Sequence, residues 1–196
     1  MELMIAGIIL FFGMHLISST FIRSNLISAF GRLPYLGLYS AVSAVGLGLL
    51  IYGYSQFNPL ENSWLWTPFS FGKMTAHALM PLAFILLLSA YLPGKIRVAT
   101  KHPMMIATLL WSTSHLLANG DLASTLIFGS FFIYGILAIV LHKPRTTTLD
   151  TYAPAVIANK KEGKIVFDLV AVIVGLGIHA LVMLNHQSLF GVPVTG

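Results

Sequence analysis

The stretch WSTSHLLANGDLAS, residues 111–124, joins two long apolar runs through a break of only three residues, Asn119, Gly120 and Asp121. A glycine in the left-handed conformation commonly ends a helix, and an aspartate is a good cap for the first turn of the next one. We therefore expect one helix to end at Gly120 and another to start after Asp121. His115 then lies in the last turn of the first helix, one turn after Trp111.

The composition places this chain in a membrane. Of its 196 residues, 57% are hydrophobic and 9% are charged, and the mean hydropathy is +0.85. Soluble domains carry about 25% charged residues, so this chain has too few charges to cover a water-facing surface. We predict an all-α polytopic membrane protein with lipid as a partner.

Six apolar runs can supply helices that cross a bilayer, which takes roughly 20 residues each. They cover about residues 3–22, 34–55, 73–92, 103–118, 122–141 and 165–185. No internal repeat and no second domain is visible. We therefore expect one transmembrane domain over residues 1–196, folded as a six-helix bundle.

The basic residues give the predicted bundle a direction. Ten of the eleven lysines and arginines lie in the loops after the first, third and fifth runs, and Lys73 alone lies on the other side. Basic residues gather on the cytoplasmic side of membrane proteins, so both termini are predicted to face outward. The same bias explains the formal charge of +5 without a nucleic-acid partner.

Small residues recur every four positions in two of the runs. Ser40, Ala44 and Gly48 lie in the second run, and Ala171 and Gly175 lie in the sixth. Small residues at this spacing let helix backbones, or a flat cofactor, approach closely. We expect both faces to be packing faces.

The residues that are missing exclude several functions. The chain has no cysteine, which excludes disulfides, thiolate metal sites and cysteine nucleophiles. No acidic residue lies in the middle of a predicted span, which disfavours a proton- or sodium-coupled transporter. No glycine-rich phosphate loop, serine nucleophile motif or zinc protease motif is present.

Four histidines lie within the predicted spans, namely His15, His77, His115 and His179. Ionisable residues inside a membrane are functional candidates by default, although each of these could instead bond to a neighbouring helix. Neutral imidazole is a good ligand for iron, and the core of a helical bundle is a common place for haem. The histidines therefore predict a haem site.

Depth in the membrane narrows the choice of ligand pair. With a rise of about 1.5 Å per residue, His15 lies about 18 Å from the outer boundary and His115 about 18 Å from the inner one. Their side chains lean toward their own helix N-termini and therefore toward each other. His77 and His179 lie at depths close to His115, so depth alone would favour His77 with His115 or with His179. Because His77 leans outward, away from the middle of the bundle, His77 and His179 are kept as secondary candidates and the choice stays open.

The chain resembles the NnrU family of membrane proteins over nearly its whole length. Five segments carry the resemblance, and the most specific of them is the one that ends in HLLANGDLAS. They are GIILFFGMHLISS (7–19), GRLPYLGLYSAVSAVGLGLLIYGY (31–54), HALMPLAFILLLSAYLPGKI (77–96), KHPMMIATLLWSTSHLLANGDLAS (101–124) and HALVMLNHQSLFGVPV (179–194). The resemblance implies a link to nitrogen-oxide metabolism in denitrification. We therefore expect a multi-pass protein of the bacterial inner (cytoplasmic) membrane, in which the outward-facing termini predicted from the basic residues lie on the periplasmic side.

The family is also similar to the plastid 15-cis-zeta-carotene isomerase, a haem b enzyme with two histidine axial ligands. One ligand lies in a motif like FFGMHLISS, which matches His15, and the other in a block like KHPMMIATLLWSTSHLL, which matches His115. The resemblance thus implies haem b with His15 and His115 as its axial ligands. The isomerase has a cysteine three residues before the second ligand, whereas this chain has Ser112, which counts against the same reaction here.

Three interpretations follow. The first is a haem b protein with redox or isomerase-like chemistry, acting on a small molecule such as nitric oxide or on a polyene. The second is a haem-free scaffold that matures or regulates a nitrogen-oxide reductase, with other membrane proteins of that metabolism as partners. The third, a histidine-lined channel, ranks last because no selectivity filter is recognisable. Whether the protein is an enzyme stays open.

Overall fold

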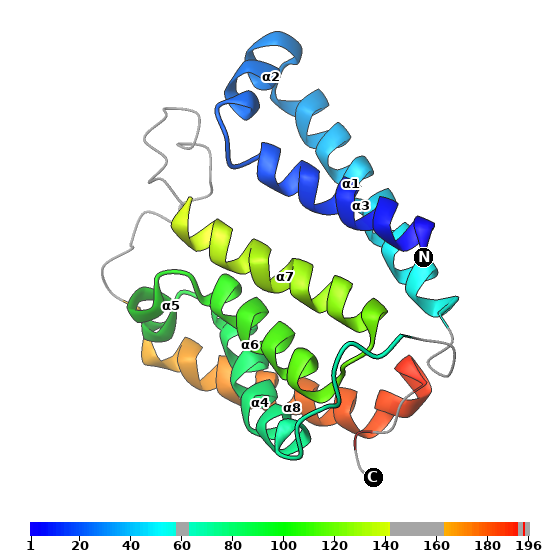
Figure 1. The fold of residues 1–196 in the computed structure, drawn as a ribbon. Helices are drawn as coiled ribbons and strands as arrows, with labels where there is room; N and C mark the ends of the chain where they lie inside the picture. The colour runs from blue at the N-terminus through cyan, green and yellow to red at the C-terminus, as the bar shows by residue number, and fades with distance from the viewer. Residues whose placement is uncertain (58–62, 142–162, 192–193, 195–196) are drawn as a thin grey trace. The chain divides into compact units, whose positions relative to one another are not determined.

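The computed structural model describes all residues except 58–62, 142–162, 192–193 and 195–196. Within the described residues the chain forms eight α-helices and no strand, apart from one isolated bridge between Trp64 and Asp121. The helices are α1 (Glu2–Ile17), α2 (Ile22–Phe30), α3 (Arg32–Ser55), α4 (Gly72–Ser89), α5 (Lys95–Thr100), α6 (Pro103–Ala118), α7 (Leu122–Val140) and α8 (Ile165–Phe190). The prediction of an all-α fold is confirmed (Figure 1).

Each of the six predicted spans corresponds to a helix, but not every helix is long enough to cross a membrane alone. Among the described residues, α3, α4, α7 and α8 are long and apolar enough, and a bent pair formed by α1 and α2 would make a fifth span. Helices α1 and α6 have 16 residues each, which is about 24 Å against a hydrocarbon core of about 30 Å. Membrane character is therefore confirmed, while six spans and outward-facing termini stay predictions.

Side-chain hydroxyls end α1 five residues before the predicted boundary at residue 22. Ser18 and Ser19 donate to the carbonyl of His15, and Thr20 donates to the carbonyl of Ile17. These bonds satisfy carbonyls that have no partner at a helix C-terminus. The chain then turns, and α2 runs at 84° to α1.

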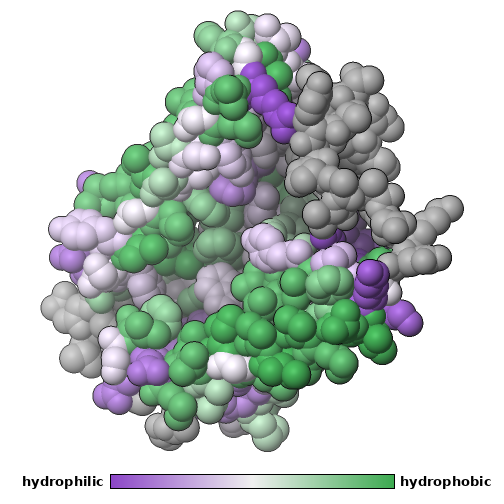
Figure 2. Space-filling model, turned by 180° about the vertical axis from the view of Figure 1, so that it is seen from behind, coloured by the Kyte–Doolittle hydropathy of each residue, from purple (hydrophilic) through white to green (hydrophobic). Residues whose placement is uncertain are grey.

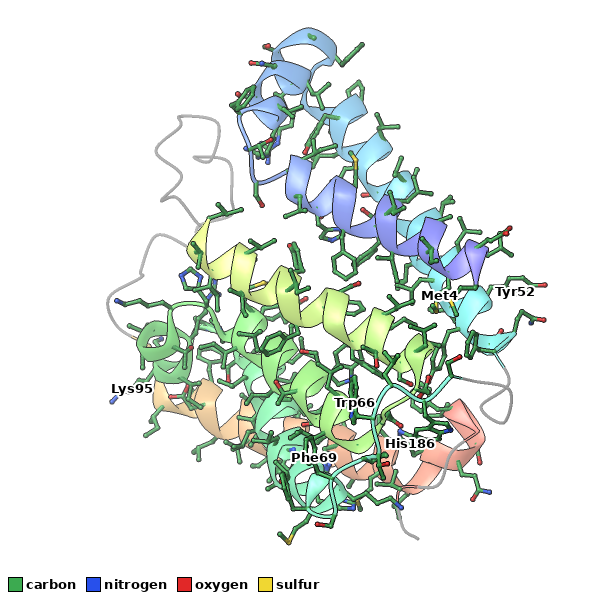
Figure 3. The ribbon with its side chains drawn as sticks, viewed as in Figure 1. Met4, Tyr52, Trp66, Phe69, Lys95 and His186 are labelled. Carbon is green, nitrogen blue, oxygen red and sulfur yellow. The ribbon has the colours of Figure 1, made fainter. Side chains whose placement is uncertain are left out.

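The helices fall into two compact units, which we describe separately. The first consists of residues 1–67 and 119–142 and contains α1, α2, α3 and α7. In it, α1 and α3 run antiparallel in close contact, because Met4 lies against Gly53 and Phe11 lies against Gly46. Figure 3 labels Met4 and Tyr52 at the ends of α1 and α3 that lie together. Helix α7 packs on α1 through Phe131, whose ring lies 4.9 Å from that of Phe12.

Glycines 46 and 53, and not the predicted face, bring α3 against α1. A Cβ on Gly46 would lie 2.7 Å from the backbone nitrogen of Phe11, whereas a Cβ on Gly48 would meet nothing within 4 Å. Ser40, Ala44 and Gly48 are all exposed within their unit. Helix α3 thus carries small residues on two faces, and α1 packs on the face that was not predicted. A packing role for Ser40, Ala44 and Gly48 stays a prediction.

The second unit consists of residues 68–118 and 143–196, and its described part contains α4, α5, α6 and α8. Helix α4 runs antiparallel to α6, because Gly72 lies against Leu117. It also packs against α8, since a Cβ on Gly175 would lie 3.0 Å from the Cα of Ile85. Ala171 is fully buried, so the predicted packing face of Ala171 and Gly175 is confirmed.

Apolar side chains also cover the outside of the helices. In α8, Ile173 is 70% exposed and Leu184 is 77% exposed. Figure 2 shows broad hydrophobic areas on the visible surface, interrupted by hydrophilic patches. Such a surface is unfavourable in water and suits hydrocarbon, which agrees with lipid contact. The predicted basic loop at 142–164 lies almost entirely outside the described residues.

The stretch at 111–124 forms the expected break, with one difference. Asp121 caps α7 by accepting a hydrogen bond from the Ser124 N–H at 2.8 Å, as predicted. Gly120 does not adopt a positive φ, so the predicted left-handed helix end is wrong. The segment around Trp66 lies close to Gly120, whose carbonyl accepts a hydrogen bond from the Leu65 N–H at 2.8 Å. Glycine is needed here because a Cβ would collide with the carbonyl of Trp66.

Candidate histidine site

His15 lies in the last turn of α1, inside an aromatic cluster of the first unit. Its ring centroid lies 4.2 Å from that of Phe11, 5.3 Å from that of Tyr39 and 5.7 Å from that of Tyr134. Its Nδ1 lies 2.7 Å from the carbonyl oxygen of Phe11, one turn earlier in the helix. Three helices of the first unit, α1, α3 and α7, therefore surround this imidazole.

The bond to Phe11 determines which ring nitrogen of His15 can bind a metal. A carbonyl oxygen only accepts hydrogen bonds, so Nδ1 carries the proton and donates it. In a neutral imidazole the lone pair is then on Nε2. Metal-binding histidines commonly show this arrangement, with one nitrogen donating to a carbonyl and the other facing the metal.

His115 repeats this arrangement in the second unit. It lies in the last turn of α6, and its Nδ1 donates to the carbonyl oxygen of Trp111 at 2.9 Å. The ring centroids of His115 and Trp111 are 5.2 Å apart. His15 and His115 thus each lie in the last turn of a 16-residue helix. Each donates a hydrogen bond to the carbonyl of the residue four positions earlier, and each packs against the aromatic ring of that residue.

The secondary candidates His77 and His179 come from α4 and α8 of the second unit. They lie close enough for an electrostatic interaction, and the ring of His179 lies 5.7 Å from that of Phe84. His115 interacts in the same way with His186, which α8 includes because this helix extends to Phe190. The pairing of His15 with His115 on one iron stays a prediction.

Clusters of metal-binding side chains are absent from the part of the chain that the structure describes. No group of three or more histidine, cysteine, aspartate or glutamate side chains there could hold a metal ion. Zinc sites usually take at least three protein ligands, whereas a haem iron takes at most two axial ligands.

The sequence analysis missed the tyrosines around His15. Tyr39, on α3, contacts the imidazole of His15. The ring centroid of Tyr35 lies 6.3 Å from that of Tyr39. The available signal was the spacing of Tyr35, Tyr39 and Ser43, because polar groups four residues apart share one face of a helix.

Comparison with known proteins identifies the family. A search of curated proteins and a search of solved structures gave no match. The family model described as NnrU protein matches residues 3–194, which covers both units and the four candidate histidines. The chain therefore belongs to the NnrU protein family.

Proposed function

We propose that this chain is an integral membrane protein that binds haem b, with His15 and His115 as the axial ligands of the iron. One observation carries the proposal: both imidazoles donate through Nδ1 to a carbonyl one turn back, at 2.7 Å from Phe11 and 2.9 Å from Trp111. Each histidine is thereby held in the tautomer that places its lone pair on Nε2.

The surroundings of the two histidines support a flat apolar ligand. Phe11 and Trp111 pack on the imidazoles, and Phe12, Phe131 and Tyr134 extend the aromatic wall beside His15. Aromatic side chains contribute large apolar surfaces with few rotamers. Their contacts with the imidazoles restrict the orientation of each ring.

The residues of this chain would position and tune the bound group. A haem b with two histidine ligands supplies one-electron chemistry, and its potential depends on the axial ligands and their hydrogen bonds. The carbonyls of Phe11 and Trp111 orient the imidazoles and increase the basicity of Nε2. If only one of the two histidines held the group, it would also offer a binding position for a small molecule.

We further propose that this small molecule is a nitrogen oxide such as nitric oxide. The choice of a nitrogen oxide rests on the resemblance of the sequence to proteins of denitrification. A polyene substrate is the alternative, and Ser112 counts against it because the chain has no thiolate ligand at that position.

The decisive experiment is the absorption spectrum of the full chain, purified in detergent from cells supplied with a haem precursor. We expect one haem b per chain and a sharp α-band after reduction with dithionite. His15→Ala and His115→Ala should each abolish this low-spin band, and His102→Ala is the matched control that should retain it. Addition of nitric oxide to the reduced protein should replace the band by a nitrosyl spectrum.

Two outcomes would overturn the proposal. If the folded wild-type chain is colourless, the haem-free scaffold for a nitrogen-oxide reductase becomes the better interpretation. If His77→Ala and His179→Ala abolish the band while His15→Ala retains it, the haem is bound by the second unit alone and the assigned pair is wrong.

A further inference from the structure

Two buried hydroxyls on one face of α3 have no hydrogen-bond partner. Among the described residues, the buried side-chain polar atoms without a partner are the hydroxyls of Tyr35 and Ser43 and the Nε1 of Trp66. Tyr35 and Ser43 lie eight residues apart on α3, with Tyr39 midway between them, so the three share a face. Tyr39 contacts His15, which places this face at the candidate haem ligand.

The hydroxyl of Tyr35 is a cost to the folded chain unless something binds it. Tyr35 is only 4% exposed, and a buried hydroxyl without a partner destabilises a protein. A phenylalanine would fill the same space without this cost. The hydroxyl therefore indicates a ligand group that reaches it.

The position of Tyr35 indicates the charge of that ligand group. It lies in the first turn of α3, which begins at Arg32. Side chains lean toward the N-terminus of their helix, so the phenol leans toward the turn of Arg32. The N-terminal end of the helix dipole favours an anion there, and Arg32 adds a positive charge at the start of the same helix. A phenol that donates to a carboxylate forms a strong, charge-assisted hydrogen bond.

We infer that the Tyr35 hydroxyl would donate a hydrogen bond to a propionate carboxylate of the haem. The inference rests on the proposed function, since haem is the ligand whose polar edge carries carboxylates. Tyr35 joins His15 through a row of aromatic rings, with centroids 6.3 Å apart between Tyr35 and Tyr39 and 5.3 Å apart between Tyr39 and His15.

The test combines one substitution with one chemical change in the ligand. Wild type and Tyr35→Phe, both as the full chain in detergent and stripped of haem, are titrated with haem and with haem dimethyl ester. The ester lacks the propionate charges. We expect Tyr35→Phe to weaken the binding of haem about tenfold, since bonds to charged groups are of this strength. The binding of the ester should be unchanged.

Tyr52→Phe is the matched control, because Tyr52 lies on the same helix and is 55% exposed. It should bind both ligands like the wild type. A second measurement needs no ligand: the thermal midpoint of the stripped Tyr35→Phe variant should equal or exceed that of the wild type, because an unpaired hydroxyl has been removed.

The inference is overturned if Tyr35→Phe weakens haem and its ester equally, which would indicate a packing role only. It is also overturned if the substitution changes neither affinity. If the wild type binds neither ligand, the proposed function itself fails, and this outcome differs from both of the others.

Discussion

The carboxylate of Asp168, in the first turn of α8, caps α5 by accepting hydrogen bonds from the backbone N–H groups of Lys95 and Ile96, both at 3.0 Å. Gly94 leaves room for this contact, because a Cβ there would collide with the carboxylate. Figure 3 labels Lys95 at α5. A side chain 73 residues further along the chain thus holds the start of this helix.

Asp168→Asn should destabilise the protein, because an amide has one acceptor oxygen and the cap uses two. We expect a loss of about 1–2 kcal/mol, in the range of hydrogen bonds to charged groups. Thermal unfolding measures the loss, and hydrogen exchange should show faster exchange at the Lys95 and Ile96 amides. Asp121→Asn is the control, because Asn caps a helix as well as Asp does. Equal losses in the two variants would contradict the two-oxygen cap.

Gly46→Ala should separate α1 from α3. The added methyl group would lie 2.7 Å from the nitrogen of Phe11, and overpacking of this kind costs about 1–3 kcal/mol. Gly48→Ala introduces the same group on the same helix where nothing lies within 4 Å, so it should be neutral or slightly stabilising. Unfolding in mixed detergent micelles compares the two variants. Similar stabilities would show that α1 does not pack on the Gly46 face.

Lys101→Gly should stabilise the protein by about 1 kcal/mol. Lys101 has φ 61° and ψ −42°, a conformation that L-residues rarely adopt, in a tight turn where the His102 N–H donates to the Thr100 carbonyl. Lys95→Gly is the control, because it places glycine in a helix and should cost up to about 1 kcal/mol. The thermal midpoints of the two variants measure these changes in stability. If Lys101→Gly lowers the midpoint as much as Lys95→Gly does, the backbone explanation is refuted.

Helix α2 should lie in the membrane interface rather than continue the span of α1. It runs at 84° to α1. Phe21, at 76%, and Phe30, at 67%, are strongly exposed. Arg23 lies in the first turn of α2, and Arg32 follows its end by two residues. Apolar side chains with basic neighbours suit the boundary between headgroups and acyl chains.

Brominated lipids can measure this depth. In a background with Trp64, Trp66 and Trp111 changed to Phe, the fluorescence of Phe30→Trp should be quenched most by bromine near the headgroup. Val45→Trp is the control, because Val45 is 57% exposed in the middle of α3 and should respond most to deep bromine. If both positions respond most to deep bromine, α1 and α2 form one broken span.

The sequence alone was sufficient for features that depend on neighbouring residues. Hydropathy located the ends of every long helix to within five residues, because an apolar run in a membrane must satisfy its backbone internally. The cap at Asp121 was predictable because its partner, the Ser124 N–H, lies three residues away. The bonds from His15 and His115 to carbonyls four residues back are equally local, although their geometry became visible only in the structure.

Only the tertiary structure shows features that depend on residues far apart in the sequence, such as helix contacts and burial. Helix α3 carries small residues on two faces, and only the presence of α1 shows that Gly46 and Gly53 form the contact while Gly48 stays open. The role of Gly120 depends on Trp66 rather than on its own backbone angle. The phenol of Tyr35 is buried without a hydrogen-bond partner, which the sequence does not reveal. Local sequence determines where helices form, because their hydrogen bonds are local, but burial depends on which faces meet.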